Sequence, residues 1–157
     1  MYKVLKSGYN KNIKDMKKEI DIMYTTIELD GKTFPCYKQG NMTLVNMTPH
    51  EVRYYGKGRE PLSIPPSGLP PIRLSEKNED EFVKEGFSFT RKVYSEAENL
   101  PGKKDGVYYI VSKMVLDAVQ RADLLAPDTG NGAVRDVDGS ETGKVGAILG
   151  TTRFVFI

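Results

Sequence analysis

Cysteine and histidine are almost absent from this sequence, and both scarcities limit the chemistry that it can support. Cys36 is the single cysteine among 157 residues, so no disulfide can form within the chain. It has no second cysteine or histidine nearby, so neither a zinc site nor a thiol nucleophile is expected there. His50 is the single histidine, and any Ser-His, Cys-His or multi-histidine metal mechanism would have to use it.

Long apolar runs and a dominant sign of charge are also missing. No run approaches the roughly 18 residues that span a bilayer, and lysines within residues 3–14 interrupt the apolar core that a secretory signal needs. Lys and Arg number 23 against 21 Asp and Glu, so a dedicated polyanion-binding protein is not indicated. At 157 residues, 39% of them hydrophobic, the chain is long enough to bury the core of one compact domain. We expect a reducing, cytoplasmic setting without a membrane or DNA partner.

The hydrophobic pattern predicts many short strands and two helices. Residues 10–23 place apolar side chains three and four apart, which indicates an amphipathic helix. Asp30-Gly31 lies between β-prone runs and predicts a hairpin. "TLVNM" and "EVRYYGKG" are expected strands, and the proline-rich residues 62–71 predict extended loop or edge structure. "PIRLSEK" and "GFSFTRKVYS" are expected as two strands separated by an acidic stretch, residues 76–85.

The second half of the chain completes this pattern. "GVYYIV" predicts a central strand, and Ser112 predicts the N-cap of a helix over "KMVLDAVQRA". Two further strands are expected over "KVGAIL" and "TTRFVFI". The fold class predicted is α+β, a small and mostly antiparallel sheet with one internal helix and the N-terminal amphipathic helix.

Two motifs allow a catalytic interpretation, but the residues around each of them argue against it. The Thr48-Pro49-x-Glu51 spacing around His50 is explained by a capping box on a single helical turn. The triplet Asp128-Thr129-Gly130 occurs in retroviral-type aspartic proteases, where two aspartates share a proton. However, Pro127 stands where a hydrophobic strand residue is needed, and "AILG" follows too closely for an intervening flap.

A calcium loop is also disfavoured for residues 128–138. The acidic and amide side chains are numerous there, but no register supplies a glycine at position six together with a glutamate at position twelve. No metal and no cofactor is therefore expected.

The loop "APDTGNGAVRD" is better suited to holding a small ligand. Gly130 and Gly132 permit close backbone approach, and Arg135 carries a planar fork that matches phosphate. Tyr108 and Tyr109 on the preceding strand offer aromatic faces of the kind that stack on a nucleobase. These features favour a small nucleotide over nucleic acid, because the arginines are not clustered in a track.

The order of several motifs resembles a family of small phage and prophage proteins. "TLVNMTPHEV", "IPPSG", "IRLSE", "GVYYIVSKMVLDAV", "RADLLAPDTG" and "AVRDVDG" are together similar to the Thoeris anti-defence family of the first described type. The resemblance runs from about Thr43 to about Leu149. Residues 1–42, for which a helix plus hairpin strands are expected, have no counterpart in that family and are taken as an N-terminal extension, and residues 43–157 are expected to form a ligand-binding α+β domain.

The resemblance implies a non-enzymatic nucleotide sponge in the cytoplasm of an infected bacterium. Such a protein binds cyclic ADP-ribose isomers and withholds them from the host effector, as a homodimer or higher homo-oligomer whose subunits build the sites jointly. Two alternatives stay open: an enzyme that degrades the signal through His50 or Asp128, and a phage accessory protein that makes protein contacts only.

Site roles follow from the same resemblance. Tyr108 or Tyr109 would stack on adenine, and Arg135 would meet the diphosphate. Arg121 is a weaker phosphate candidate. In the helix after "VYYIVS", Asp117 stands where an amide would suit a phosphate-bearing ligand better. The remaining contacts would come from the polar loop, namely Asp128, Thr129 and Asn131.

Overall fold

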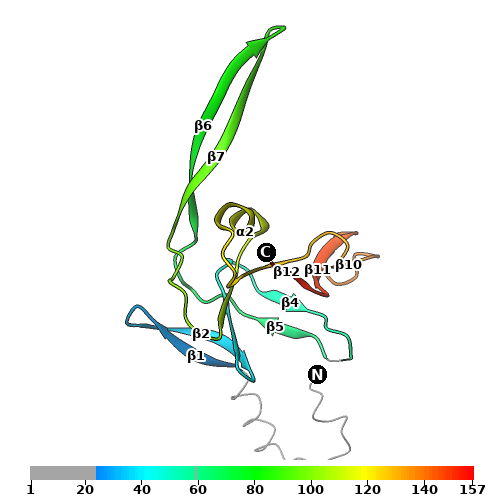
Figure 1. The fold of residues 1–157 in the computed structure, drawn as a ribbon. Helices are drawn as coiled ribbons and strands as arrows, with labels where there is room; N and C mark the ends of the chain where they lie inside the picture. The colour runs from blue at the N-terminus through cyan, green and yellow to red at the C-terminus, as the bar shows by residue number, and fades with distance from the viewer. Residues whose placement is uncertain (1–23, 59) are drawn as a thin grey trace, which may run out of the picture.

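The computed structural model describes residues 24–58 and 60–157, so the helix predicted for residues 10–23 lies outside the described part. Strands dominate these residues, and one helix accompanies them (Figure 1). In chain order the elements are β1 (Tyr24–Leu29), β2 (Lys32–Gln39), β3 (Met42–Asn46), β4 (Val52–Tyr54), β5 (Leu62–Ile64), β6 (Arg73–Lys84), β7 (Phe87–Glu98), β8 (Val107–Ile110), α2 (Lys113–Val119), β9 (Leu124–Pro127), β10 (Ala133–Asp136), β11 (Ala147–Thr151) and β12 (Phe154–Val155).

The strands form three sheets. A six-stranded sheet has the order β1-β2-β3-β8-β9-β12, a four-stranded sheet has the order β10-β11-β4-β5, and β6 pairs only with β7. Most neighbours are antiparallel, whereas β3–β8, β8–β9 and β11–β4 are parallel. The predicted α+β class with mostly antiparallel sheets is confirmed. Strands β1 and β2, from the predicted N-terminal extension, join the six-stranded sheet directly.

Local signals placed several elements correctly. Asp30 and Gly31 have φ values of 51° and 76° between β1 and β2, so both positions adopt the left-handed conformation that the sequence predicts. The predicted central strand is β8, which lies between β3 and β9. Ser112 caps α2 by accepting a hydrogen bond from the Val115 amide at 3.3 Å. Gln120, at φ 54°, ends the helix.

The two faces of the six-stranded sheet carry separate apolar clusters. Along β8, Tyr109 packs into the cluster that includes α2, and its neighbour Ile110 packs into the cluster that includes β4 and β5. Successive side chains of a strand point to opposite faces, so the neighbours Tyr109 and Ile110 pack into different layers. The first cluster secures α2, and the second joins the two larger sheets.

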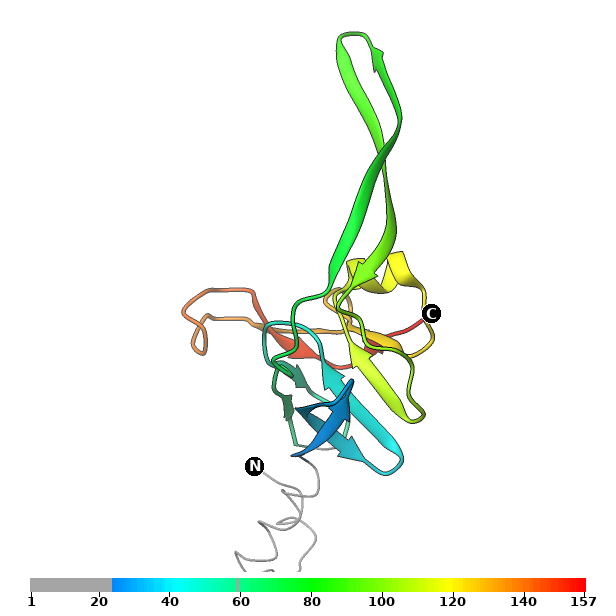
Figure 2. The same cartoon turned by 90° about the vertical axis from the view of Figure 1, so that its left-hand side faces the viewer.

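The acidic residues 76–85, expected to separate two strands, instead lie almost entirely within the first of them. Strand β6 continues through these residues to Lys84, and a two-residue turn at Glu85 and Gly86, with φ 50° and 80°, leads into β7. Cross-strand ion pairs between oppositely charged partners offset the low β-propensity of the acidic residues: Lys92 Nζ lies 2.9 Å from Glu76 Oε2. The result is a long two-stranded arm, β6-β7, that projects from the body of the molecule (Figures 1 and 2).

The predicted capping box beside His50 does not form a helical turn. Residues 48–50 are bends, and their backbone is organised by Asn46, which is fully buried. The Asn46 amide nitrogen donates to the carbonyls of His50 and Ile64, at 2.7 and 3.0 Å, and its oxygen accepts from the Thr48 amide at 2.9 Å. A side chain buried in β3 therefore replaces the helical capping pattern.

Candidate ligand-binding site

A pocket of about 370 Å³ lies between the two larger sheets. Its size falls in the range of small-molecule sites, and its walls are mostly apolar with polar groups at their tips. The lining residues come from β2 to β5, β9 and β12: Tyr37, Gln39, Met42, Leu44, Tyr54, Leu62, Leu125 and Phe154.

Aromatic rings form much of the pocket wall. Tyr54 stacks on Phe154 with ring centroids 5.5 Å apart and planes 9° from parallel. On the other side, Tyr24 meets Tyr37 edge to face at 5.4 Å, and the Tyr37 hydroxyl donates to Gln39 at 3.0 Å. Flat aromatic faces beside an amide side chain can stack on a planar heterocycle and hydrogen-bond its edge.

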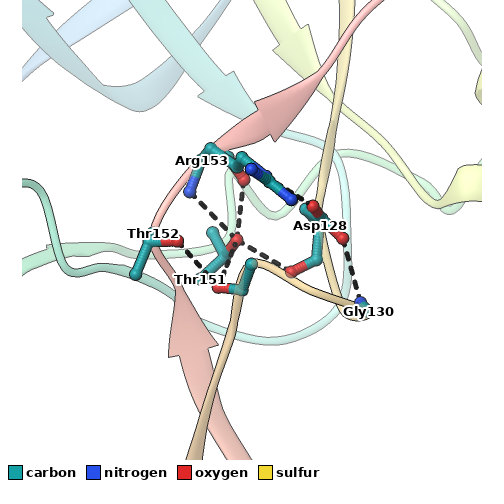
Figure 3. Close-up of polar contacts among 6 residues, drawn as sticks. Asp128, Gly130, Thr151, Thr152 and Arg153 are labelled. Carbon is teal, nitrogen blue, oxygen red and sulfur yellow. Dashed lines mark hydrogen bonds and ion pairs between the residues drawn. The ribbon is translucent and has the colours of Figure 1, made fainter.

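A cluster of polar residues adjoins this pocket, where the end of β9 lies beside the start of β12. We call this cluster, formed by Asp128, Gly130, Gly132, Thr151 and Arg153, the crossover. Phe154 pairs with Pro127 across the two strands, and the next residues outward are Asp128 and Arg153. Arg153 Nε donates to Asp128 Oδ2 at 2.7 Å, and the Gly130 amide donates to Asp128 Oδ1 at 2.9 Å (Figure 3). The Asp128 side chain is 17% exposed and that of Arg153 is 59% exposed, so the carboxylate holds an accessible guanidinium in place.

Thr151 stands at the centre of the crossover. Its hydroxyl oxygen lies 2.6 Å from the Arg153 carbonyl and 2.9 Å from that of Asp128 (Figure 3). One hydroxyl hydrogen serves one acceptor at a time, so these carbonyls share it. Thr151 also pairs with Tyr54 of β4, which connects the crossover to the aromatic wall.

Gly132 completes the crossover because no side chain would fit there. A Cβ atom at this position would lie 2.9 Å from the Asp128 side chain and 3.0 Å from Arg153 Cγ. The Gly132 carbonyl also accepts from the Thr152 hydroxyl at 3.0 Å and from the Thr152 amide at 2.8 Å. Side chains of the chain itself therefore approach Gly132 closely, and the approach of a ligand to the glycines of this loop stays a prediction.

The hydrogen bond from Arg153 lowers the pKa of the Asp128 carboxyl, and the Gly130 amide lowers it further. A general base for neutral pH needs a pKa raised toward 7, so this environment moves Asp128 in the opposite direction. Asp128 is therefore a stable anion that orients Arg153.

Arg135 lies farther from the pocket than Asp128. It is an exposed residue of β10, at the opposite end of the four-stranded sheet from β5, and Nη1 donates to the Gly146 carbonyl at 2.9 Å. The loop after β10 is organised by Asp136, whose Oδ2 accepts from the amide and the hydroxyl of Thr142, both at 2.7 Å. Thr129 and Asn131 are exposed on the loop after Asp128.

The structure separates the two candidate tyrosines. Tyr108 is half-buried against the cluster that borders the pocket. Tyr109 is fully buried on the other face, its hydroxyl donates to the Gly102 carbonyl at 3.1 Å, and burial raises its pKa. Arg121 lies over the Tyr109 ring at 5.8 Å and is held by Asp123 through two bonds of 2.6 and 2.8 Å. Tyr109 and Arg121 thus lie together, away from the pocket.

Sequence reasoning missed Arg153 and the ring of Phe154 as site residues. Arg153 gains its position through Asp128, 25 residues earlier, and Phe154 through Tyr54, a hundred residues earlier. No local pattern reports such pairs.

The described part of the chain offers few groups for nucleophilic catalysis or metal binding. His50 is exposed, and Cys36 is buried with a pKa raised by that burial. Within residues 24–58 and 60–157, no three His, Cys, Asp or Glu side chains group as metal ligands. The one helix described there, α2, is too short to cross a membrane.

Comparison with known proteins gives no relative: no protein-family model, no curated protein and no solved structure matches this chain.

Proposed function

We propose that this protein binds a small nucleotide-type signal, a cyclic ADP-ribose isomer, and holds it without cleaving it. The observation that carries the proposal is the aromatic pocket adjoining the Asp128–Arg153 crossover. The motif order of the sequence supports the choice of ligand. In this view the chain is a phage anti-defence protein that blocks Thoeris signalling by sequestration, acting as a homodimer or larger homo-oligomer in the cytoplasm of an infected bacterium.

The pocket suits the base of such a ligand. Tyr54 and Phe154 supply aromatic surfaces, and a stacked base gains about 1–3 kcal/mol per aromatic contact. Gln39 places a polar amide at the pocket wall, where its oxygen accepts from the Tyr37 hydroxyl.

Two arginines suit the phosphates. The bond from Arg153 to Asp128 uses Nε, which leaves its two terminal amino groups for an incoming anion. Arg135 is anchored through one terminal nitrogen to Gly146 and is otherwise exposed. An arginine held in place before binding loses less conformational entropy when the ligand arrives, which favours tight and slowly released binding.

The environment of the acidic groups favours binding over catalysis. Neighbouring donors lower the pKa of the Asp128 and Asp136 carboxyls, so neither is poised to take a proton near neutral pH. Sequestration requires only that the charges of the ligand are met and that water is excluded from its base.

Calorimetric titration with a panel of cyclic ADP-ribose isomers tests the proposal. Saturable binding, followed by heat denaturation that returns the ligand intact, is expected. Loss of the ligand with turnover under excess would favour the signal-degrading enzyme, and no binding or thermal shift with any isomer would favour an accessory protein. A ligand at about 100 times its dissociation constant should stabilise the fold by about 2.7 kcal/mol.

Variants locate the site within the same titration. Arg153→Gln removes one phosphate contact, and Tyr54→Leu removes a stacking face; each should weaken binding by roughly 10- to 100-fold, corresponding to about 1.5–3 kcal/mol. Arg135→Gln tests the loop. Arg73→Gln is the matched control, because Arg73 is an exposed arginine on β6 outside the pocket. Unchanged affinity in the Arg153 and Tyr54 variants would remove this pocket from the site.

A further inference from the structure

The β6-β7 arm extends far from the body of the molecule (Figure 2), and it carries large exposed apolar side chains. Phe82 is 56% exposed, Phe87 is 69% exposed and Phe89 is 46% exposed. A two-stranded ribbon is at best marginally stable in water by itself, and exposed apolar patches of this kind mark contact surfaces. The arm therefore calls for a partner.

The three phenylalanines lie on one face of the arm. Phe82 pairs with Phe89, and their rings stack at 5.0 Å; Lys84 pairs with Phe87 in the next rung on the same face toward the tip. Residues two apart on β7 share a face, so Phe87, Phe89 and Arg91 point the same way. Arg91 pairs with Glu79, and the extra β6 residue between Glu79 and Phe82 keeps this third rung on the same face.

We propose that this face binds the same face of a second copy of the chain, with the two arms antiparallel about a two-fold axis through the Phe82–Phe89 rung. Under such an axis each strand meets its own copy, because an isologous contact applies the same surface twice. Phe82 then faces the Phe82 of the second copy, and Phe89 faces Phe89. The inference does not depend on the proposed nucleotide site.

The order of charges along the arm supports a second copy as the occupant. The axis brings the Lys84–Phe87 rung of one arm over the Glu79–Arg91 rung of the other. On β6 the Lys84 ammonium meets the Glu79 carboxylate, and on β7 the Phe87 ring meets the Arg91 guanidinium. Both pairings occur twice, so the face is complementary to itself in shape and in charge.

The area available indicates a reversible association. Each exposed ring contributes on the order of 100 Å², about half of what an aromatic side chain buries, which gives roughly 300 Å² of apolar surface per copy. With the flanking charged rungs the total for both copies is about 1,000 Å², the lower end of specific interfaces. The dimer should therefore dissociate on dilution.

A membrane surface suits the tip less well than a second copy does. The distal part of the arm carries Glu79, Asp80, Glu81 and Glu85 beside Lys84, and these carboxylates would be repelled by anionic lipid. Binding to phosphatidylglycerol vesicles is therefore the outcome that a lipid-directed tip would give instead.

Sedimentation of the full chain over a dilution series tests the proposal through a charge exchange. Lys84→Glu and Glu79→Lys should each weaken dimerisation by about tenfold, since each places like charges together twice. An equimolar mixture of the two variants restores both opposite-charge pairs, so the mixture should dimerise as the wild type does. The Lys84→Glu/Glu79→Lys double variant should recover in the same way.

Two further variants separate the face from the fold of the arm. Phe82→Ser with Phe89→Ser should abolish dimerisation, whereas Val83→Ser, on the opposite and equally exposed face, should leave it unchanged. A chain that is monomeric at every concentration, a mixture that fails to recover, or co-sedimentation with phosphatidylglycerol vesicles would overturn the proposal.

Discussion

At the scale of single residues, burial decides what a side chain does, and adjacent positions in a strand can have opposite fates. Tyr108 borders the cluster next to the pocket, while Tyr109 fills the core beneath α2. The sequence shows only two consecutive tyrosines. Strand alternation predicts that they separate, but which one faces which layer depends on where α2, β4 and β5 pack, and these are long-range contacts.

Asn46 gives the first prediction. Its fully buried amide makes bonds of 2.7 to 3.0 Å to His50, Ile64 and Thr48, so Asn46→Ala removes all three bonds and takes the buried Ile64 carbonyl's side-chain donor away. Each such loss costs about 1–3 kcal/mol, and the free energy of unfolding should fall by about 2–4 kcal/mol in urea denaturation. The matched control Asn78→Ala, at an exposed arm position, should change it by less than about 0.5 kcal/mol. Equal losses in both variants would contradict this role.

Asp128 gives a pH-dependent prediction. The Arg153 hydrogen bond lowers the pKa of Asp128 below its ordinary value of 3.8, so the folded state favours the carboxylate. This stabilisation is complete above pH 3.8 and is lost as the pH falls through the folded-state pKa. Asp128→Asn should therefore be less stable than wild type at pH 7, and the difference should shrink below pH 4. Urea denaturation at both pH values measures it; a gap that stays constant with pH would assign the effect to something other than the charge.

At the scale of elements, the sequence predicts the turn at Asp30-Gly31 but not the length of strand β6. Asp30-Gly31 was recognised because β-prone residues flank it, whereas Glu85-Gly86 adopts the same conformation within an acidic stretch and was missed. The acidic residues of β6 become strand only through partners on β7 such as Lys92 and Arg91. Intrinsic propensity cannot supply that information, because cross-strand neighbours decide it.

The contact between β11 and β4 yields the prediction for an element. A Cβ atom on Gly150 would lie 2.4 Å from the Arg53 carbonyl oxygen and 2.6 Å from the Tyr55 ring, so Gly150→Ala must push the two strands apart. Such overpacking costs about 1–3 kcal/mol. Displacement of β4 should also move Tyr54 and weaken ligand binding. Gly102→Ala is the control, because a Cβ there meets nothing within 4 Å. Thermal unfolding of both variants checks the difference, and an unchanged Gly150 variant would mean that the strands yield without cost.

At the scale of the whole molecule, the body and the arm differ: the body holds the buried core, whereas the arm beyond its base is exposed. Leu74, at the base of β6, packs against the first core cluster, while side chains from residue 80 to residue 92 are all exposed. The residues that line the pocket include none from the arm. The proposed ligand pocket and the proposed arm interface therefore lie on different surfaces.

Removal of the arm tests this separation. Replacing residues 77–93 with Asn-Gly joins Glu76 to Tyr94, which already pair across the strands, through a two-residue turn. The truncated body should unfold within about 2 °C of wild type, because the exposed arm contributes little to the core. It should remain monomeric in sedimentation and still bind the nucleotide ligand in calorimetry. A large fall in melting temperature would show that the arm supports the body. Loss of ligand binding in a stable truncated body would show that a second copy completes the pocket, as the jointly built sites of the sponge resemblance require.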